Sequence, residues 1–249
     1  MTPGTAGLLA VAGFLGGAIN AAAGGGTLVT FPALLHAGLT PLSANVTNTV
    51  GLVPGYLGGV LGHQRGRESL PEVGQRTLAL TATAGAAIGV VLLLTTPEKL
   101  FTSVAPYLVL VAVVLLLAQK RILAALRARG HGGGRRWVLA AAFAGGVYGA
   151  YFGAALGVLL LALLSITSRA EFPLANAVKT LLAFIVNMLA ALAYAVFAPV
   201  AWWPALVIAI ASTAGGYLGG TVARRIPVLV LRLVTAALGL VAFVTLLRR

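Results

Sequence analysis

The residue whose type and position most strongly suggest chemistry is Lys179. It lies several positions inside an apolar segment, residues 173–198, that contains no acidic side chain. A lysine within a membrane helix costs about 2.5–3.5 kcal/mol on insertion scales. A cation without a protein counter-ion suits an anionic ligand. Lys179 is therefore a candidate anion-binding residue, and the alternative is a lysine whose long side chain extends to the membrane interface.

Polar side chains cluster in two apolar segments. In the first they are Asn45, Thr47, Asn48 and Thr49, and in the second Asn176, Thr180 and Asn187. Residues three or four apart share a helix face. Asn45, Asn48 and Thr49 would therefore lie on one side of the first helix, and on the second helix one side would carry Asn176, Lys179, Ala183 and Asn187. Amide and hydroxyl groups donate hydrogen bonds to an anion without adding charge. The two faces predict one substrate site, and the alternative is hydrogen bonding between helices, worth about 0.6 kcal/mol per contact.

Three consecutive glycines, Gly24, Gly25 and Gly26, interrupt the first apolar segment. Glycine leaves the backbone unrestrained, so the run predicts a helix break. A helix that restarts at Thr27 would direct its free N–H groups and its positive dipole end at the break, which favours an anion. Asn20 precedes the break and is a further candidate ligand. The alternative is close helix packing through small residues.

Other kinds of site find no support in the sequence. The chain has no cysteine and no aspartate, and His36, His63 and His131 are scattered. A metal centre needs clustered ligands, and an enzyme needs paired carboxylates or an activated nucleophile. We therefore expect no metal, no cofactor and no enzymatic activity.

Composition indicates which elements must hold these residues. Of the 249 residues, 60% are hydrophobic and 8% charged, with a mean hydropathy of +1.03, whereas a soluble domain carries about 25% charged residues. The net charge of +13 comes from Lys and Arg between apolar runs, the pattern of cytoplasmic loops in membrane proteins. These properties predict a multi-pass protein of the cell membrane, with the lipid bilayer as its surroundings, and exclude a nucleic-acid-binding domain.

Eight apolar runs are long enough, or nearly so, for a bilayer-crossing helix, which takes about 20 residues. They are residues 5–23, 40–62, 73–95, 100–119, 137–157, 173–198, 204–222 and 227–247, with shorter runs at 27–38 and 158–167. They lack the alternation of apolar and polar residues found in membrane barrels. The predicted fold is all-α, a polytopic membrane protein of about eight membrane segments, with helix breaks or re-entrant hairpins at the glycine segments.

The two halves of the chain carry the same ordered motifs. A glycine segment, a short apolar run and a string with Pro and Ala-x-x-Thr occur at 24–47 and again at 153–180. Internal repeats of this kind are typical of secondary transporters. We therefore expect a first repeat at residues 1–120, a basic cytoplasmic loop at 121–136 and a second repeat at 137–249.

The positions of the basic residues favour inverted repeats. If each glycine segment turns a hairpin, each repeat keeps three crossing helices, and an odd number inverts the second repeat. The basic positions that then fall inside are Arg65, Arg67, Arg76, residues 120–136, Arg169, Arg224 and Arg225. The uncharged loop 198–201 falls outside. Lys99 and the terminal arginines also fall outside, which is contrary to the rule that basic residues lie in cytoplasmic loops. The alternative is eight simple crossings with parallel repeats.

One string of motifs resembles a known family. Gly24-Gly25-Gly26, Pro32-Ala33-Leu34 and Pro41-x-x-Ala44-x-x-Thr47 are similar to the sulfite exporter TauE/SafE family of bacterial membrane proteins, and Pro173 with Ala177-x-x-Thr180 resembles its second repeat. Ala155 and Leu156 stand where the family often has glycine. The resemblance covers essentially the whole chain and implies a transporter that exports sulfite, sulfoacetate and other organosulfonates.

These features predict a secondary transporter that exports small anions. The site would lie near the membrane midplane, and access would alternate by movement of one repeat against the other. No acidic residue lies within a span, and export of an anion down an inside-negative potential needs no coupled ion. An anion channel or facilitator is the main alternative. A membrane-embedded enzyme and a scaffold are alternatives of other classes, and a homodimer is compatible with these features.

Overall fold

The protein folds as a bundle of α-helices. The computed structural model describes residues 2–22, 24–62, 70–128, 134–222 and 228–247. Within these ranges it has ten helices and no strand, which confirms the all-helical prediction. In chain order they are α1 Pro3–Ala22, α2 Thr27–His36, α3 Pro41–Gly62, α4 Gln75–Thr95, α5 Glu98–Ala128, α6 Arg135–Tyr151, α7 Leu156–Thr167, α8 Phe172–Phe197, α9 Trp202–Val222 and α10 Val228–Leu247.

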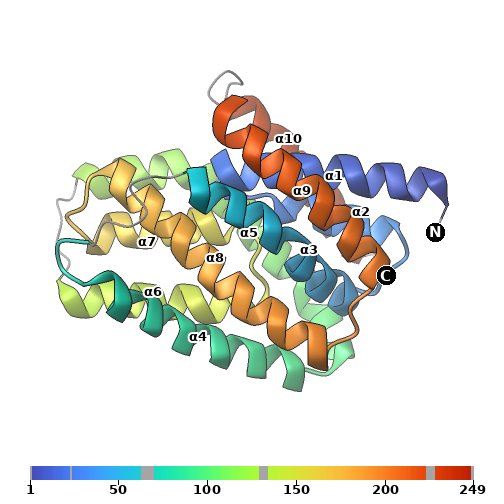
Figure 1. Cartoon of the computed structure of the whole chain (residues 1–249), viewed down its shortest axis with the longest axis horizontal. Helices are drawn as coiled ribbons and strands as arrows, with labels where there is room; N and C mark the ends of the chain where they lie inside the picture. Colours follow the sequence, from blue (N-terminus) through green and yellow to red (C-terminus); the bar gives the residue numbers. More distant parts are fainter. Residues whose placement is uncertain (1, 23, 63–69, 129–133, 223–227, 248–249) are drawn as a thin grey trace.

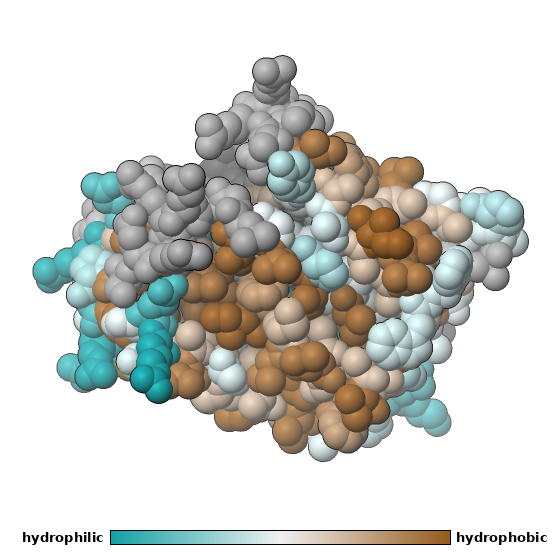
Figure 2. Space-filling view, viewed as in Figure 1, coloured by the Kyte–Doolittle hydropathy of each residue, from teal (hydrophilic) through white to brown (hydrophobic). Residues whose placement is uncertain are grey.

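The outer surface of the bundle is suited to lipid. Among the described residues, α1, α4, α5 and α8 contain the four segments that are long and apolar enough to cross a membrane. Large apolar side chains are exposed on the outside, among them Leu80, Val196 and Ile210. Figure 2 shows a broad apolar surface across one face, with hydrophilic residues toward its two ends. These features are those of a multi-pass membrane protein.

Two helices are too short to cross. α2 has ten residues and α7 has twelve, which at about 1.5 Å per residue reach roughly half of a bilayer core. Each forms a hairpin with the helix before it. In Figure 1, α2 and α7 lie in opposite halves of the molecule, because they run from the interior toward different ends.

Two helix boundaries differ from the prediction. α5 continues to Ala128, so the first eight residues of the basic segment 121–136 are helical rather than loop. Residues 121–128 are mostly Leu, Ala and Arg, which favour helix regardless of charge. α6 ends at Tyr151, although the apolar run continues to 157. Hydropathy cannot mark that end, because the break is as apolar as the helix.

Helices from one half of the chain pack closely against helices from the other. α1 packs along α9, and α6 packs along α4. A β-carbon on Gly215 of α9 would lie 1.9 Å from the Phe14 carbonyl oxygen of α1, and one on Gly85 of α4 would lie 2.2 Å from that of Phe143. Small residues permit such close approach in membranes. α3 likewise packs against α8, and α5 against α10.

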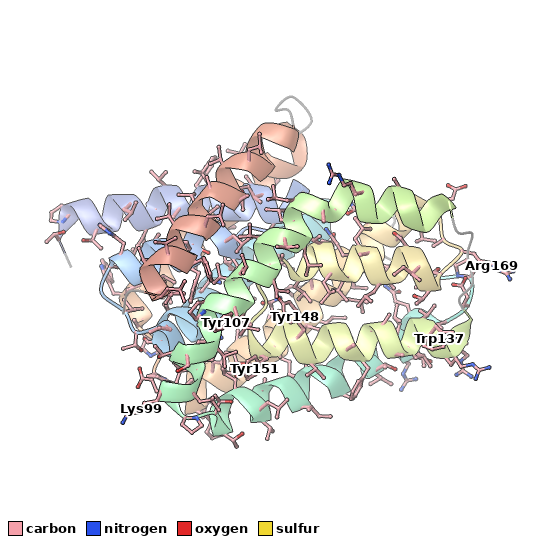
Figure 3. The ribbon with its side chains drawn as sticks, turned by 180° about the vertical axis from the view of Figure 1, so that it is seen from behind. Lys99, Tyr107, Trp137, Tyr148, Tyr151 and Arg169 are labelled. Atoms are coloured by element: carbon pink, nitrogen blue, oxygen red, sulfur yellow. The ribbon has the colours of Figure 1, made fainter. Side chains whose placement is uncertain are left out.

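The two ends of the bundle carry different residues. Figure 3 shows Arg169 and Trp137 at one end and Lys99 at the other. Both chain termini lie at the Lys99 end (Figure 1). Several basic residues used in the topology prediction lie outside the described residues, namely Arg65, Arg67, Arg129, Arg224, Arg225, Arg248 and Arg249.

Candidate functional site

The first helix break is built around Gly26. Its N–H donates a 2.7 Å hydrogen bond to Asn20 Oδ1, and its carbonyl accepts from the N–H groups of Val29 and Thr30. A β-carbon on Gly26 would lie 2.0 Å from the Gly16 carbonyl oxygen, so a side chain does not fit. Asn20 is 5% exposed, and its Nδ2 has no partner among the described residues. The break therefore contains a buried amide nitrogen that forms no hydrogen bond with a described residue, although the Tyr56 hydroxyl lies close to Asn20.

A polar network fastens this break to α3. The Asn48 amide accepts a hydrogen bond from the Thr30 hydroxyl and donates one of 3.4 Å to Thr27 Oγ1. Tyr56, also on α3, interacts through its hydroxyl with Thr27 and Asn20. Both ends of the Asn48 amide are thus used within the protein. Sequence reasoning missed Tyr56, although its spacing from Asn48 places it on the same face of the helix.

The second helix break, between α6 and α7, has a sharp backbone turn. Gly153 has a φ of +71° and Ala155 a φ of +55°, the left-handed region that glycine adopts freely and that costs alanine about 1–2 kcal/mol. The Tyr148 hydroxyl donates a 2.6 Å hydrogen bond to the Ala154 carbonyl, and the Tyr194 hydroxyl donates to the last turn of α6. The break therefore forms even though Ala155 replaces glycine.

The two breaks meet in the interior. A β-carbon on Gly24 would lie 2.6 Å from Gly157 Cα, and one on Gly157 would lie 2.7 Å from Gly24 Cα. α2 and α7 begin beside these glycines. Their N-terminal ends, which carry positive partial charge, therefore converge on one place. Such an arrangement favours an anion.

Two of the predicted amides reach the second break from different helices. Asn45 Nδ2 of α3 donates a 3.0 Å hydrogen bond to the Tyr151 carbonyl. Asn187 Oδ1 of α8 lies 3.9 Å from the position of a β-carbon on Gly153. Asn187 Nδ2 donates to the Ala183 carbonyl over 2.7 Å. Each amide nitrogen is therefore hydrogen-bonded to a carbonyl of the protein, and neither amide oxygen accepts a hydrogen bond from a described residue.

Lys179 is enclosed within the bundle. Its side chain is 2% exposed, and no described residue forms a hydrogen bond or ion pair with it. An interfacial lysine would instead expose its amino group. On the same helix, the Thr180 hydroxyl donates a 2.9 Å hydrogen bond to the Asn176 carbonyl, and the Asn176 side chain is half-buried. The acidic residues that the structure describes lie at or outside helix ends, namely Glu72, Glu98 and Glu171.

Hydrogen bonds join the two halves of the chain at both ends of the bundle. Thr47 Oγ1 accepts a 2.9 Å hydrogen bond from the Ala201 N–H. At the opposite end, the Glu72 carboxylate accepts one of 2.8 Å from the Ser168 hydroxyl and one of 2.6 Å from the Arg169 N–H. Thr47, predicted to bind substrate, is thus occupied by the loop between α8 and α9.

One further buried polar residue was missed by sequence reasoning. Gln119 of α5 is 3% exposed, and its Oε1 has no partner among the described residues. It lies one turn beyond Leu116, whose side chain is 3.3 Å from the position of a β-carbon on Gly25. An amide at the end of a long apolar run is the signal that could have identified it. A surface hollow beside Arg135 and Arg136 lies at the start of α6, about 25 Å along that helix from the break.

The chain is similar to membrane transporters over most of its length. A family model described as "Sulfite exporter TauE/SafE" matches residues 9–246. A relative from Sinorhizobium sp., "Probable membrane transporter protein ORF9", is 36% identical over 113 residues. That alignment covers 45% of this chain and only 42% of the relative. No solved structure matches the chain.

Both matches are to transport proteins, and the family match spans both helix breaks and Lys179. These matches support a role in membrane transport, and neither of them is to an enzyme. By this match, the chain belongs to the sulfite exporter TauE/SafE family.

Proposed function

We propose that this protein is a secondary carrier that exports sulfite, sulfoacetate or related organosulfonates from the cell. The observation that carries the proposal is the meeting of α2 and α7 at Gly24 and Gly157. Two positive helix ends inside an apolar bundle favour an anion there. The family name supports sulfite as the type of substrate.

A positive charge and neutral hydrogen-bond donors would bind the anion jointly. Lys179 supplies a positive charge that no described acidic residue neutralises. Asn20 Nδ2 would supply a hydrogen bond, and charge-assisted hydrogen bonds to oxyanions are strong. Most N–H groups at the start of α2 and α7 already bond carbonyls of the breaks, so these helix ends would act mainly through their positive partial charge. We assign a supporting role to three predicted residues whose polar groups already have protein partners, namely Thr47, Asn48 and Thr180.

Two inverted repeats would give the carrier its alternating motion. Gly24 and Gly157 are separated by 133 residues, as are Ala44 and Ala177 of the shared motif. A residue that touches its own counterpart lies on the twofold axis that relates two repeats. The opposite directions of α2 and α7 in Figure 1 support inversion. We therefore keep residues 1–120 and 137–249 as the two repeats.

The hydrogen bonds at the two ends would act as gates. Thr47 with Ala201 closes one end, and Glu72 with Ser168 closes the other. Each pair joins one repeat to the other, so rotation of the repeats would break one pair while the other holds. The site would then open to one side at a time, as alternating access requires.

Counterflow in proteoliposomes tests the carrier mechanism. Vesicles loaded with unlabelled sulfoacetate should accumulate external labelled sulfoacetate, and the flux should saturate. A linear flux without counterflow would identify a channel.

A thermal-shift panel of sulfite, sulfoacetate, taurine, sulfate and acetate on the purified protein tests the substrate class. If no sulfur oxyanion stabilises the protein more than acetate does, the substrate assignment is wrong.

A further inference from the structure

We propose that the second helix break also binds a small monovalent cation of about the size of sodium, at oxygens separate from the anion site. The groups that point to it are the amides of Asn45 and Asn187 and the C-terminal end of α6. The sequence suggested both amides as donors to an anion. In the structure each amide nitrogen is held by a protein carbonyl, and it is the amide oxygens that lack a protein partner.

The orientation of the Asn45 amide is set by its partner. Its Nδ2 lies 3.0 Å from the Tyr151 carbonyl oxygen, and a carbonyl only accepts, so the nitrogen must be on that side. The oxygen Oδ1 is then buried without a partner among the described residues, in a side chain that is 0% exposed. Buried acceptors without partners are rare in folded proteins. The oxygen therefore calls for a ligand that carries positive charge or a donor.

Asn187 presents a second oxygen at the same break. Its Nδ2 is bound to the Ala183 carbonyl at 2.7 Å, which fixes the amide in the same way. Its Oδ1 lies 3.9 Å from the position of a β-carbon on Gly153, and the Gly149 carbonyl oxygen lies 2.8 Å from that position. Oxygens from α8 and α6 thus lie close to one point beside Gly153, where a side chain is absent.

The helix dipole at this point favours a cation. α6 ends at Tyr151, and the C-terminal end of a helix carries negative partial charge. The carbonyls of Tyr148, Ala150 and Tyr151 already accept hydrogen bonds, which leaves the Gly149 carbonyl oxygen of this last turn for a cation. Unwound backbone and half-helix C-terminal ends bind the coupling ions of transporters by the same physics. The second break therefore has two chemically different sides, the C-terminal end of α6 for a cation and the N-terminal end of α7 for an anion.

The chemistry of the coordinating oxygens also indicates the charge of the ion. The oxygens at the break are neutral amides and carbonyls, and no described carboxylate lies within the apolar helices around it. Divalent cations in proteins usually require carboxylates, so a monovalent cation fits better. Asn187 follows Lys179 by two turns of α8, about 12 Å along the axis. A cation at the break and Lys179 would thus flank the same anion, and each ligand would strengthen the binding of the other. Only this last consequence rests on the proposed function.

Cation-dependent thermal unfolding of the purified full-length protein tests the site without any transported anion. Sodium, lithium and potassium chloride are titrated against choline chloride at constant ionic strength. We expect a saturable rise in melting temperature with sodium that choline does not produce. Asn45→Ala and Asn187→Ala should each lose this sodium-specific rise. Asn48→Ala is the matched control, because that amide lies on α3 but already uses both polar atoms, and it should keep the rise.

Two further variants distinguish failure of the cation site from failure of the proposed anion transport. Asn187→Asp adds a carboxylate and should respond at lower sodium concentration than the wild type, which a merely structural role for Asn187 would not produce. Lys179→Met should keep the sodium response, so failure of the anion proposal leaves this one standing. Equal curves in sodium and choline would overturn the cation site. So would a rise produced by methylammonium but not by sodium and lost in Asn45→Ala, because the oxygens would then bind an amine.

Discussion

Lys179 is the residue on which anion binding should depend most. Burial of a cation without a partner disfavours the empty protein, and an anion compensates it. We predict that Lys179→Met, which nearly keeps the volume, loses the stabilisation by sulfite or sulfoacetate while the ligand-free protein is at least as stable. An anion at one hundred times its dissociation constant should stabilise the wild type by about 2.7 kcal/mol. Thermal unfolding with and without the anion measures the difference.

The conservative variant makes the result interpretable. Lys179→Arg keeps the charge and changes the donor geometry, so it should retain part of the stabilisation. Full stabilisation of Lys179→Met would show instead that backbone and amide donors hold the anion without the lysine.

Asparagine illustrates how little a residue type says about its role. Asn20, Asn45 and Asn48 all lie in apolar helices and are all nearly inaccessible. Asn48 is saturated by two threonines, Asn20 retains a free N–H group, and Asn45 retains a free oxygen. The hydrogen-bond partners of each amide decide whether it links two helices, can donate to an anion or can coordinate a cation.

At the level of elements, the three glycines of the first break are not equivalent. A β-carbon on Gly25 would meet side-chain atoms of Leu116 at 3.3 Å and Thr235 at 3.8 Å, whereas one on Gly26 would lie 2.0 Å from the backbone of Gly16. We predict that Gly26→Ala lowers the free energy of unfolding by about 1–3 kcal/mol, as overpacking does, because α1 and α2 must move apart. Gly25→Ala should fold almost normally.

Melting temperatures of the two variants in the same detergent check this prediction, with Gly7→Ala of α1, where a β-carbon meets nothing within 4 Å, as the control for an uncrowded glycine. Equal melting temperatures for Gly25→Ala and Gly26→Ala would contradict the packing argument. Anion stabilisation of Gly25→Ala then reports on the site itself, free of a folding defect.

For the whole molecule, the residues at the two ends of the bundle predict which end faces the cytoplasm. Lys99 and Arg169 are both exposed and lie at opposite ends of the bundle (Figure 3). The chain has no cysteine, so single cysteines can be introduced directly. With inverted repeats and basic loops inside, a membrane-impermeant maleimide should label Lys99→Cys in intact cells, and Arg169→Cys only after permeabilisation.

The unlabelled cysteine-free protein is the control for this measurement. Labelling of Arg169→Cys but not of Lys99→Cys in intact cells would show that the bundle has the opposite orientation in the membrane, because the two residues lie at opposite ends. The result is independent of the substrate, because it depends only on how the helices are oriented.

Much of the architecture follows from the sequence. The all-helical membrane fold, the family and both glycine breaks could be predicted, because hydropathy and glycine act locally and each can be recognised within one or two turns of chain. The end of α6 at Tyr151 could not, because the residues on both sides are equally apolar. The continuation of α5 to Ala128 was not predicted either, because its basic residues indicated a loop.

The arrangement of the candidate site was decided only by tertiary structure. The contact of Gly24 with Gly157, the closure of the ends by Thr47 and Glu72, and the roles of the asparagines all join residues that are far apart in the chain. Residue type and spacing describe one helix face at a time. Whether a polar group is free or satisfied depends on which other helix packs against that face, so the free donor of Asn20 and the free oxygen of Asn45 exist only in the folded bundle.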